Sequence, residues 1–277
     1  MKSFVSSDGL TLAYRDEGEG VPVVCLAGLT RNATDFDDFA PTVPDGIRLI
    51  RPDYRGRGQS DYDPTYANYA IPVEARDVVE LLDHLNIDKA VFVGTSRGGL
   101  ISMVLAATAK ERLAGVFLND IGPIIETAGL DHIKTYLGRN PTFKTYAEAA
   151  GFLPITNAET FLGVSSERWR ACAERWWLET PEGLIIRYDP KLRDAVLESS
   201  AAPAPDVWPL FDAMADIPLA MVRGANSNIL SLETAQRMQD LRPDMIWNEV
   251  ADRGHVPFLD EPECVAAFHS LMERVTL

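Results

Sequence analysis

A serine flanked by glycines is the first feature of this chain that could perform chemistry. Gly94, Ser96 and Gly98 form a G-x-S-x-G pattern. In that pattern the serine lies on a strained turn between a strand and a helix, and small residues are needed two positions before and after it because the backbones crowd there. The turn exposes the hydroxyl as a nucleophile for a carbonyl carbon. The competing interpretation is a plain glycine turn with a structural serine, since the pattern alone is common.

The residues around this serine favour the catalytic interpretation. Residues 90–93 form a short apolar run typical of a buried strand, and residues 100–109 contain neither proline nor glycine and suit a helix. We therefore predict that Ser96 lies at a junction between a strand and a helix.

A serine nucleophile needs a base, and the chain contains four histidines, His84, His132, His255 and His269. His255 follows a predicted strand in a loop beside Gly254, from which it can reach the carboxyl edge of a parallel sheet, where ligands bind in open α/β folds. A core histidine is the competing interpretation of His255. For the other three, packing or surface roles are favoured.

The order of the predicted elements indicates an α/β fold with a mostly parallel central sheet covered by helices on both faces. A β-hairpin opens the chain around Asp8 and Gly9, and apolar runs then alternate with helical segments up to residue 122. Residues 123–216 contain helical segments, prolines and large aromatics but no convincing buried strand. Strand and helix resume at residue 219. We therefore predict a core of residues 1–122 and 217–277 with an inserted helical cap at 123–216.

One predicted helix, over residues 71–85, carries its apolar residues at helical spacing. Its charged residues Glu74, Arg76, Asp77 and Glu80 are accordingly expected to face water.

Together these motifs resemble the serine hydrolases of the α/β-hydrolase fold family. Residues 94–98 resemble its nucleophile elbow, residues 254–257 its catalytic-histidine loop, and residues 53–60 its D-x-R-G-x-G-x-S loop. The resemblance covers nearly the whole chain outside the cap. It implies that Ser96 attacks a carbonyl carbon, that His255 accepts and later returns the proton, and that water hydrolyses the resulting acyl-enzyme.

The resemblance also implies an oxyanion hole formed by the backbone N–H groups of Leu29 and Arg97. The loop before Leu29 begins Ala27-Gly28, whereas relatives usually have His-Gly there. The backbone role can survive this change because the donor is an amide. The Arg97 side chain has two open interpretations, a contact with an acidic group of the substrate and a structural salt bridge.

Two positions compete for the carboxylate that orients His255. Most relatives place the acid where this chain has Asn228, and an amide cannot stabilise an imidazolium by charge. Some relatives place it after the strand that follows the nucleophile helix, which here is Asp120, 24 residues beyond Ser96. We favour Asp120; a weakened triad at Asn228, natural or engineered, and an unrecognised acid are the alternatives, and the motif around Asp120 could also be structural.

Aromatic residues are concentrated in the predicted cap. Trp169, Trp176 and Trp177 are predicted to lie on one helical segment, and with Tyr136 they are candidate substrate contacts, although packing within the cap is the favoured interpretation. If some of them line the site, the substrate is apolar and bulky.

Composition narrows the class of protein. The 277 residues are 46% hydrophobic, a globular value, and a net charge of −15 disfavours nucleic acid and anionic membranes as partners. Three scattered cysteines argue for buried thiols, and metal-binding and nucleotide-binding motifs are lacking, so we expect no metal and no cofactor. The first residues form no apolar signal core, so a cytoplasmic location is expected.

The function predicted from the sequence is a serine hydrolase that cleaves a carboxylic ester or lactone of a small, apolar or aromatic molecule. A carbon–carbon bond hydrolase with the same triad is one alternative, because one fold hosts several chemistries. A weakly active or non-catalytic binding relative is another, motivated by Asn228. Substrate identity and oligomeric state are left open.

Overall fold

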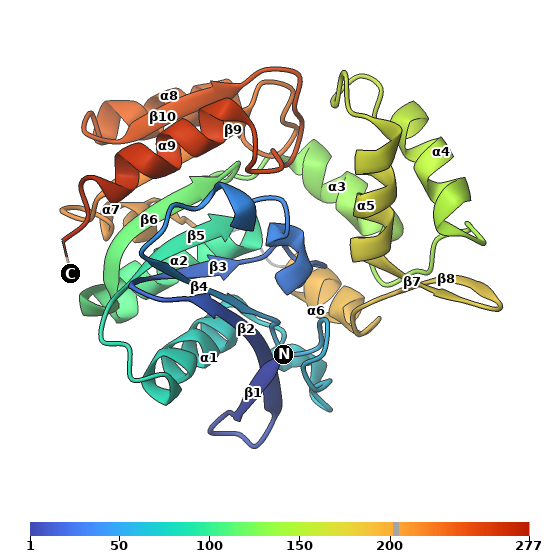
Figure 1. Cartoon of the computed structure of the whole chain (residues 1–277), viewed down its shortest axis with the longest axis horizontal. Helices are drawn as coiled ribbons and strands as arrows, with labels where there is room; N and C mark the ends of the chain where they lie inside the picture. Colours follow the sequence, from blue (N-terminus) through green and yellow to red (C-terminus); the bar gives the residue numbers. More distant parts are fainter. Residues whose placement is uncertain (202–204, 277) are drawn as a thin grey trace.

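An eight-stranded sheet organises the chain in the computed structural model, which describes residues 1–201 and 205–276. The strand order is β1-β2-β4-β3-β5-β6-β9-β10 (Figure 1). The strands are β1 (Lys2–Val5), β2 (Thr11–Gly18), β3 (Val21–Leu26), β4 (Ile47–Pro52), β5 (Ala90–Thr95), β6 (Leu113–Asn119), β9 (Leu219–Gly224) and β10 (Ile246–Val250).

The pairing of the strands brings distant loops together. β1 and β2 form the predicted antiparallel hairpin, β2 pairs antiparallel with β4, and every pair from β4 to β10 is parallel. The carboxyl ends of β3, β5, β6, β9 and β10 therefore meet at one edge of the sheet, where ligands bind in open α/β folds. This confirms the predicted fold class.

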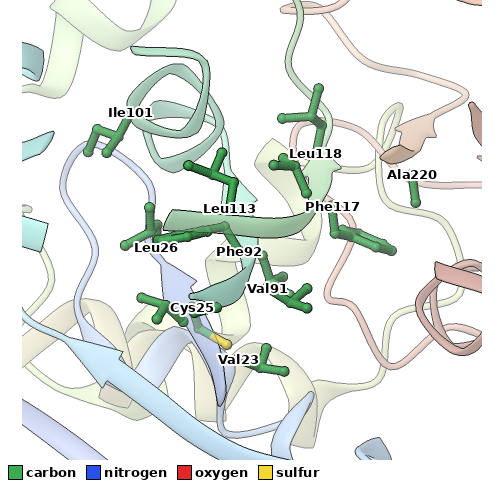
Figure 2. Packing of buried hydrophobic residues seen from close by; sticks show 14 of the residues in the cluster. Val23, Cys25, Leu26, Val91, Phe92, Ile101, Leu113, Phe117, Leu118 and Ala220 are labelled. Atoms are coloured by element: carbon green, nitrogen blue, oxygen red, sulfur yellow. The ribbon is translucent and has the colours of Figure 1, made fainter. Parts of the chain in front are cut away.

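Helices cover both faces of this sheet. Neighbouring residues of a strand point to opposite faces, and in β6 the ring of Phe117 contacts Phe268 of α9 (Pro262–Met272) while Leu118 lies against Gly99 of α2 (Arg97–Thr108). Figure 2 shows the buried apolar layer around these strands. The core further includes α1 (Ile71–His84), α7 (Trp208–Asp212) and α8 (Leu232–Leu241).

The segment between β6 and β9 contains the predicted helices together with a small hairpin. Figure 1 shows α3, α4 and α5 beyond the carboxyl end of the sheet. The elements are α3 (Thr127–Tyr136), α4 (Tyr146–Thr156), α5 (Ser166–Trp176), β7 (Trp177–Thr180), β8 (Gly183–Ile186) and α6 (Leu192–Ser199).

This segment has an apolar cluster of its own, which includes Leu153, Trp169, Cys172 and Leu184. Phe211 of α7 and the nearby Met214 pack in the main core, although both lie within the predicted range of 123–216.

Two expectations about local structure are wrong. Trp177 does not share the helix of Trp169 and Trp176, because α5 ends at Trp176 and Trp177 begins strand β7. Glu74 and Asp77 do not face water: they are 0% and 5% exposed. The buried Arg55 and Arg57 of the 53–60 loop pair with Asp77 and Glu74. Helical spacing could not reveal this burial, because the arginines come from outside the helix.

The three cysteines are buried free thiols, as predicted. Over residues 1–201 and 205–276, no helix is long and apolar enough to cross a membrane.

Candidate active site

Ser96 occupies a strained turn between β5 and α2. Its backbone has φ 51° and ψ −112°, a conformation that L-residues rarely adopt. The glycines two positions away make this turn sterically possible. A Cβ on Gly94 would lie 2.6 Å from the backbone of Gly98, and one on Gly98 would lie 2.0 Å from the carbonyl oxygen of Leu26. The turn thus raises the hydroxyl of Ser96 above the carboxyl end of the sheet.

Three side chains from three loops meet at this point. The His255 ring lies between the other two, with Nε2 2.9 Å from Ser96 Oγ and Nδ1 2.7 Å from Asp120 Oδ2. The Asp120 side chain is 0% exposed and that of His255 is 14% exposed. A neutral imidazole that donates from Nδ1 to the carboxylate leaves Nε2 free to accept the serine proton.

Asp120 is held by further hydrogen bonds that leave its carboxylate little freedom. It follows β6 with φ 54°. The backbone N–H of Gly224 donates to Oδ1 at 2.9 Å, and the hydroxyl of Ser227 donates to Oδ2 at 2.6 Å. These two donors and the His255 ring together fix the orientation of the carboxylate.

Asn228 does not take the place of an acid. In the described part of the chain it makes no hydrogen bond to His255, and it lies in the wall of the adjacent cavity. Its neighbour Ser227 contacts Asp120 instead, a role that the sequence analysis missed. The loop after β9 therefore supports His255 through Asp120, to which Ser227 donates its hydrogen bond.

The two expected oxyanion donors belong to segments that lie beside Ser96. The backbone N–H groups of Leu29 and Arg97 have no acceptor within the described residues. The loop of Leu29 lies close to the serine, because a Cβ on Gly28 would be 3.9 Å from Ser96 Cβ. Two unpaired amide donors beside a serine hydroxyl are suited to bind an oxygen that becomes negative.

The Arg97 side chain forms a structural salt bridge, which decides between its two interpretations. Its Nε donates to Glu74 Oε2 at 2.6 Å, and its Nη2 donates to the carbonyl of Tyr69 at 2.9 Å. Arg57 also pairs with Glu74, at 2.8 Å, and donates from Nε to the carbonyl of Leu29 at 3.0 Å.

The buried Glu74 therefore links the residues that carry both candidate oxyanion donors. Burial opposes ionisation of Glu74, but the two guanidinium groups outweigh it and hold its pKa below the ordinary value.

A cavity of about 640 Å³ opens beside His255, between the sheet edge and the helical segment. Its wall includes all four aromatic candidates, Tyr136, Trp169, Trp176 and Trp177. Trp169 is 2% exposed and packs against Phe161 and Phe258, so it serves chiefly as core, whereas Tyr136 is 43% exposed. The wall also contains the cations Arg31, Arg139 and Arg175, which the sequence analysis did not single out.

Within the described residues, the other three histidines have partners other than Ser96. His84 packs against Phe4 and Tyr14, His269 lies 3.4 Å from the carbonyl of Thr42, and His132 stacks edge-on with Tyr136 in the cavity wall. Across the described residues, no group of three or more histidine, cysteine, aspartate or glutamate side chains could hold a metal ion.

Comparison with known proteins gives a consistent family. A family model described as alpha/beta hydrolase fold matches residues 21–262. The chain is 34% identical to the 3-hydroxybutyrate-oligomer hydrolase of Cupriavidus necator over 95% of this chain and 93% of the relative. It is 27% identical to the 2-(acetamidomethylene)succinate hydrolase of Mesorhizobium japonicum, over 85% and 82% of the two chains. The crystal structure of an alpha/beta hydrolase from Novosphingobium aromaticivorans superposes with a TM-score of 0.91 at 38% identity, covering 99% and 98%.

Proposed function

Because this chain belongs to the alpha/beta hydrolase fold family, we propose that it is a serine hydrolase that cleaves a carboxylic ester or lactone of a small molecule through an acyl-enzyme. The observation that carries the proposal is the continuous path from Ser96 Oγ through His255 to Asp120, with separations of 2.9 and 2.7 Å.

The chemistry starts with proton transfer along this path. His255 Nε2 accepts the hydroxyl proton of Ser96 as Oγ attacks the carbonyl carbon, and Asp120 stabilises the imidazolium that forms. His255 then protonates the leaving alcohol, which departs and leaves an acyl group on Ser96. Water, activated by the same histidine, hydrolyses this acyl-enzyme and restores the serine.

The negative charge of the tetrahedral intermediate is stabilised by the N–H groups of Leu29 and Arg97. Preorganised donors of this kind each contribute about 3–4 kcal/mol to transition-state stabilisation. The ion pairs of Glu74 with Arg57 and Arg97 keep the two donor segments in place.

Two observations favour ester cleavage over the alternatives. The relative in Cupriavidus necator is named for an oligomer of 3-hydroxybutyrate, whose units are joined by esters. Asn228 motivated the alternative of a non-catalytic binding relative, but the side chain beside His255 Nδ1 is the carboxylate of Asp120, which supports a catalytic role. A carbon–carbon bond hydrolase would use the same relay, so substrate tests must separate the two.

The proposal is tested with a fluorophosphonate probe and a panel of short esters and lactones. We expect labelling at Ser96 and ester turnover, and both should be lost in Ser96→Ala. Ser102→Ala is a matched control, because Ser102 lies in α2, the helix that follows Ser96, and its hydroxyl donates to the carbonyl of Gly98. Labelling without turnover of any ester would favour carbon–carbon bond cleavage, and absence of labelling would overturn the proposal.

A further inference from the structure

Two arginines in the cavity wall, Arg175 and Arg31, differ in how closely a carboxylate pairs with them. Arg175 binds both carboxylate oxygens of Asp38, which also pairs with Arg168. Arg31 has only a distant partner, Asp35, whose carboxylate is 3.9 Å from its Nε. Within residues 1–201 and 205–276, the Arg31 guanidinium donates no hydrogen bond. A 28% exposed cation with unused donors therefore faces the cavity.

Asp35, the carboxylate nearest to Arg31, also interacts with a second guanidinium. Burial raises the pKa of Asp35 above its ordinary value, although Arg31 and Arg175 oppose that shift. The carboxylate of Asp35 therefore lies near two guanidinium groups and does not serve Arg31 alone.

The position of Arg31 relates it directly to the nucleophile. A Cβ on Gly28 would lie 3.4 Å from Arg31 Cγ and 3.9 Å from Ser96 Cβ, so the two residues flank the same glycine. From there the Arg31 guanidinium extends to the ring of Trp176, with its central carbon 4.0 Å from the ring centroid. Stacking holds the plane of a guanidinium while leaving the N–H donors on its edge available.

We propose that Arg31 binds a carboxylate of the substrate, so that the preferred substrates are short esters that carry a second, ionised carboxyl group a few bonds from the scissile ester. This inference rests on the proposed ester hydrolase function and names its substrate class. A guanidinium and a carboxylate can form two parallel hydrogen bonds, which fixes the orientation of the substrate as well as its charge.

The negative net charge of the chain means that an anionic substrate can bind only where a local cation attracts it. A net charge of −15 repels anions at long range. An anionic ester therefore needs a specific cation within the cavity, where a partly desolvated ion pair is stronger than in water. The preferred substrate is then not wholly apolar: its carboxylate binds Arg31, and only its carbon chain contacts the aromatic wall.

The test compares esters that carry an ionised carboxyl group with counterparts in which that group is esterified. Monoethyl succinate carries the extra carboxylate on the acyl side, and diethyl succinate is its neutral counterpart. 3-Acetoxybutyrate carries the carboxylate on the alcohol side, and its methyl ester is the neutral counterpart. We expect the wild type to prefer the anionic member of at least one pair. Arg31→Gln should lower kcat/KM for that anionic ester by about 10- to 100-fold, mostly through KM, and change the neutral ester by less than about threefold.

Matched variants separate recognition from structure. Arg31→Lys keeps the charge but loses the planar fork, so it should retain an intermediate preference. Arg237→Gln removes an arginine stacked at 4.1 Å on Trp208, outside the cavity, and should leave the preference unchanged.

Each negative result has a distinct meaning. Equal turnover of charged and neutral esters by the wild type would overturn the inference, as would an Arg31→Gln variant that loses both activities equally. A wild type that is not labelled by the fluorophosphonate and hydrolyses no ester would instead overturn the proposed function, and with it the inference about Arg31.

Discussion

Glu74 Oε2 accepts a 2.6 Å hydrogen bond from Arg97, the residue that directly follows Ser96. The other oxygen of this fully buried carboxylate pairs with Arg57, which in turn binds the carbonyl of Leu29. A single side chain on α1 thereby connects the two segments whose amides are proposed to bind the oxyanion.

Glu74→Gln is expected to damage both stability and catalysis. It leaves the buried guanidinium of Arg57 and the partly buried one of Arg97 without this counter-charge, which should lower the free energy of unfolding by about 3–5 kcal/mol. Urea unfolding and kcat measure the two effects. Asp83→Asn is the control on the same helix, because its side chain is 62% exposed and should change stability by less than about 1 kcal/mol. A fully stable Glu74→Gln variant would contradict the buried ion-pair network.

Asp120→Asn should lower kcat by about ten-thousandfold if the carboxylate stabilises the imidazolium as in serine proteases. The amide oxygen can still accept from Gly224, so the fold should be retained, and thermal unfolding would verify this. Asn228→Asp is the companion variant and should not raise kcat, because position 228 makes no hydrogen bond to His255 in the described structure. An unchanged kcat in Asp120→Asn would remove Asp120 from the mechanism.

Gly98→Ala and Gly151→Ala should have opposite effects, although both glycines lie in helices. A methyl group at position 98 would meet the Leu26 carbonyl at 2.0 Å, so stability should fall by about 3 kcal/mol or more, and the displaced turn should reduce kcat. Position 151 in α4 has no atom within 4 Å of the added carbon, so alanine there should raise stability by about 0.5–1 kcal/mol. Equal tolerance of both changes in urea unfolding would contradict the crowded turn.

Asp16 should make stability depend on pH in acid. Hydrogen bonds from Arg48 and Lys2 outweigh burial and lower its pKa from 3.8 to about 2. Because the folded-state pKa is the lower one, this contribution is complete above about pH 4 and is lost as the pH falls towards 2. After allowance for solvent screening, it amounts to of the order of 1 kcal/mol.

The Asp16→Asn variant isolates this effect. The difference in unfolding free energy between wild type and variant should be largest near pH 7 and shrink between pH 4 and 2. A difference that stays constant over that range would show that Asp16 does not account for the dependence.

Much of the framework follows from local patterns in the sequence. Strand β3 (Val21–Leu26) coincides with one of the apolar runs, and α8 and α9 belong to the strand and helix alternation that resumes at residue 219, because each signal lies within the element itself. The strand, turn and helix around Ser96 were predictable for the same reason. Trp177 was misplaced because α5 and β7 join without a breaker residue, and pairing with β8 decides where the strand begins.

The sequence by itself determined the α/β alternation, the position of Ser96 at its turn and the loop that carries His255. Only the tertiary structure decided which partner His255 has. Asp120 and Asn228 both follow neighbouring strands at one sheet edge, and the direction of each side chain depends on backbone angles and on Gly224 and Ser227, which spacing does not encode. The burial of Glu74 was hidden for the same physical reason, since Arg57 and Arg97 come from elsewhere in the chain and meet it only after folding. The stacking of Arg31 on Trp176 was hidden likewise, because the two residues are far apart in the sequence.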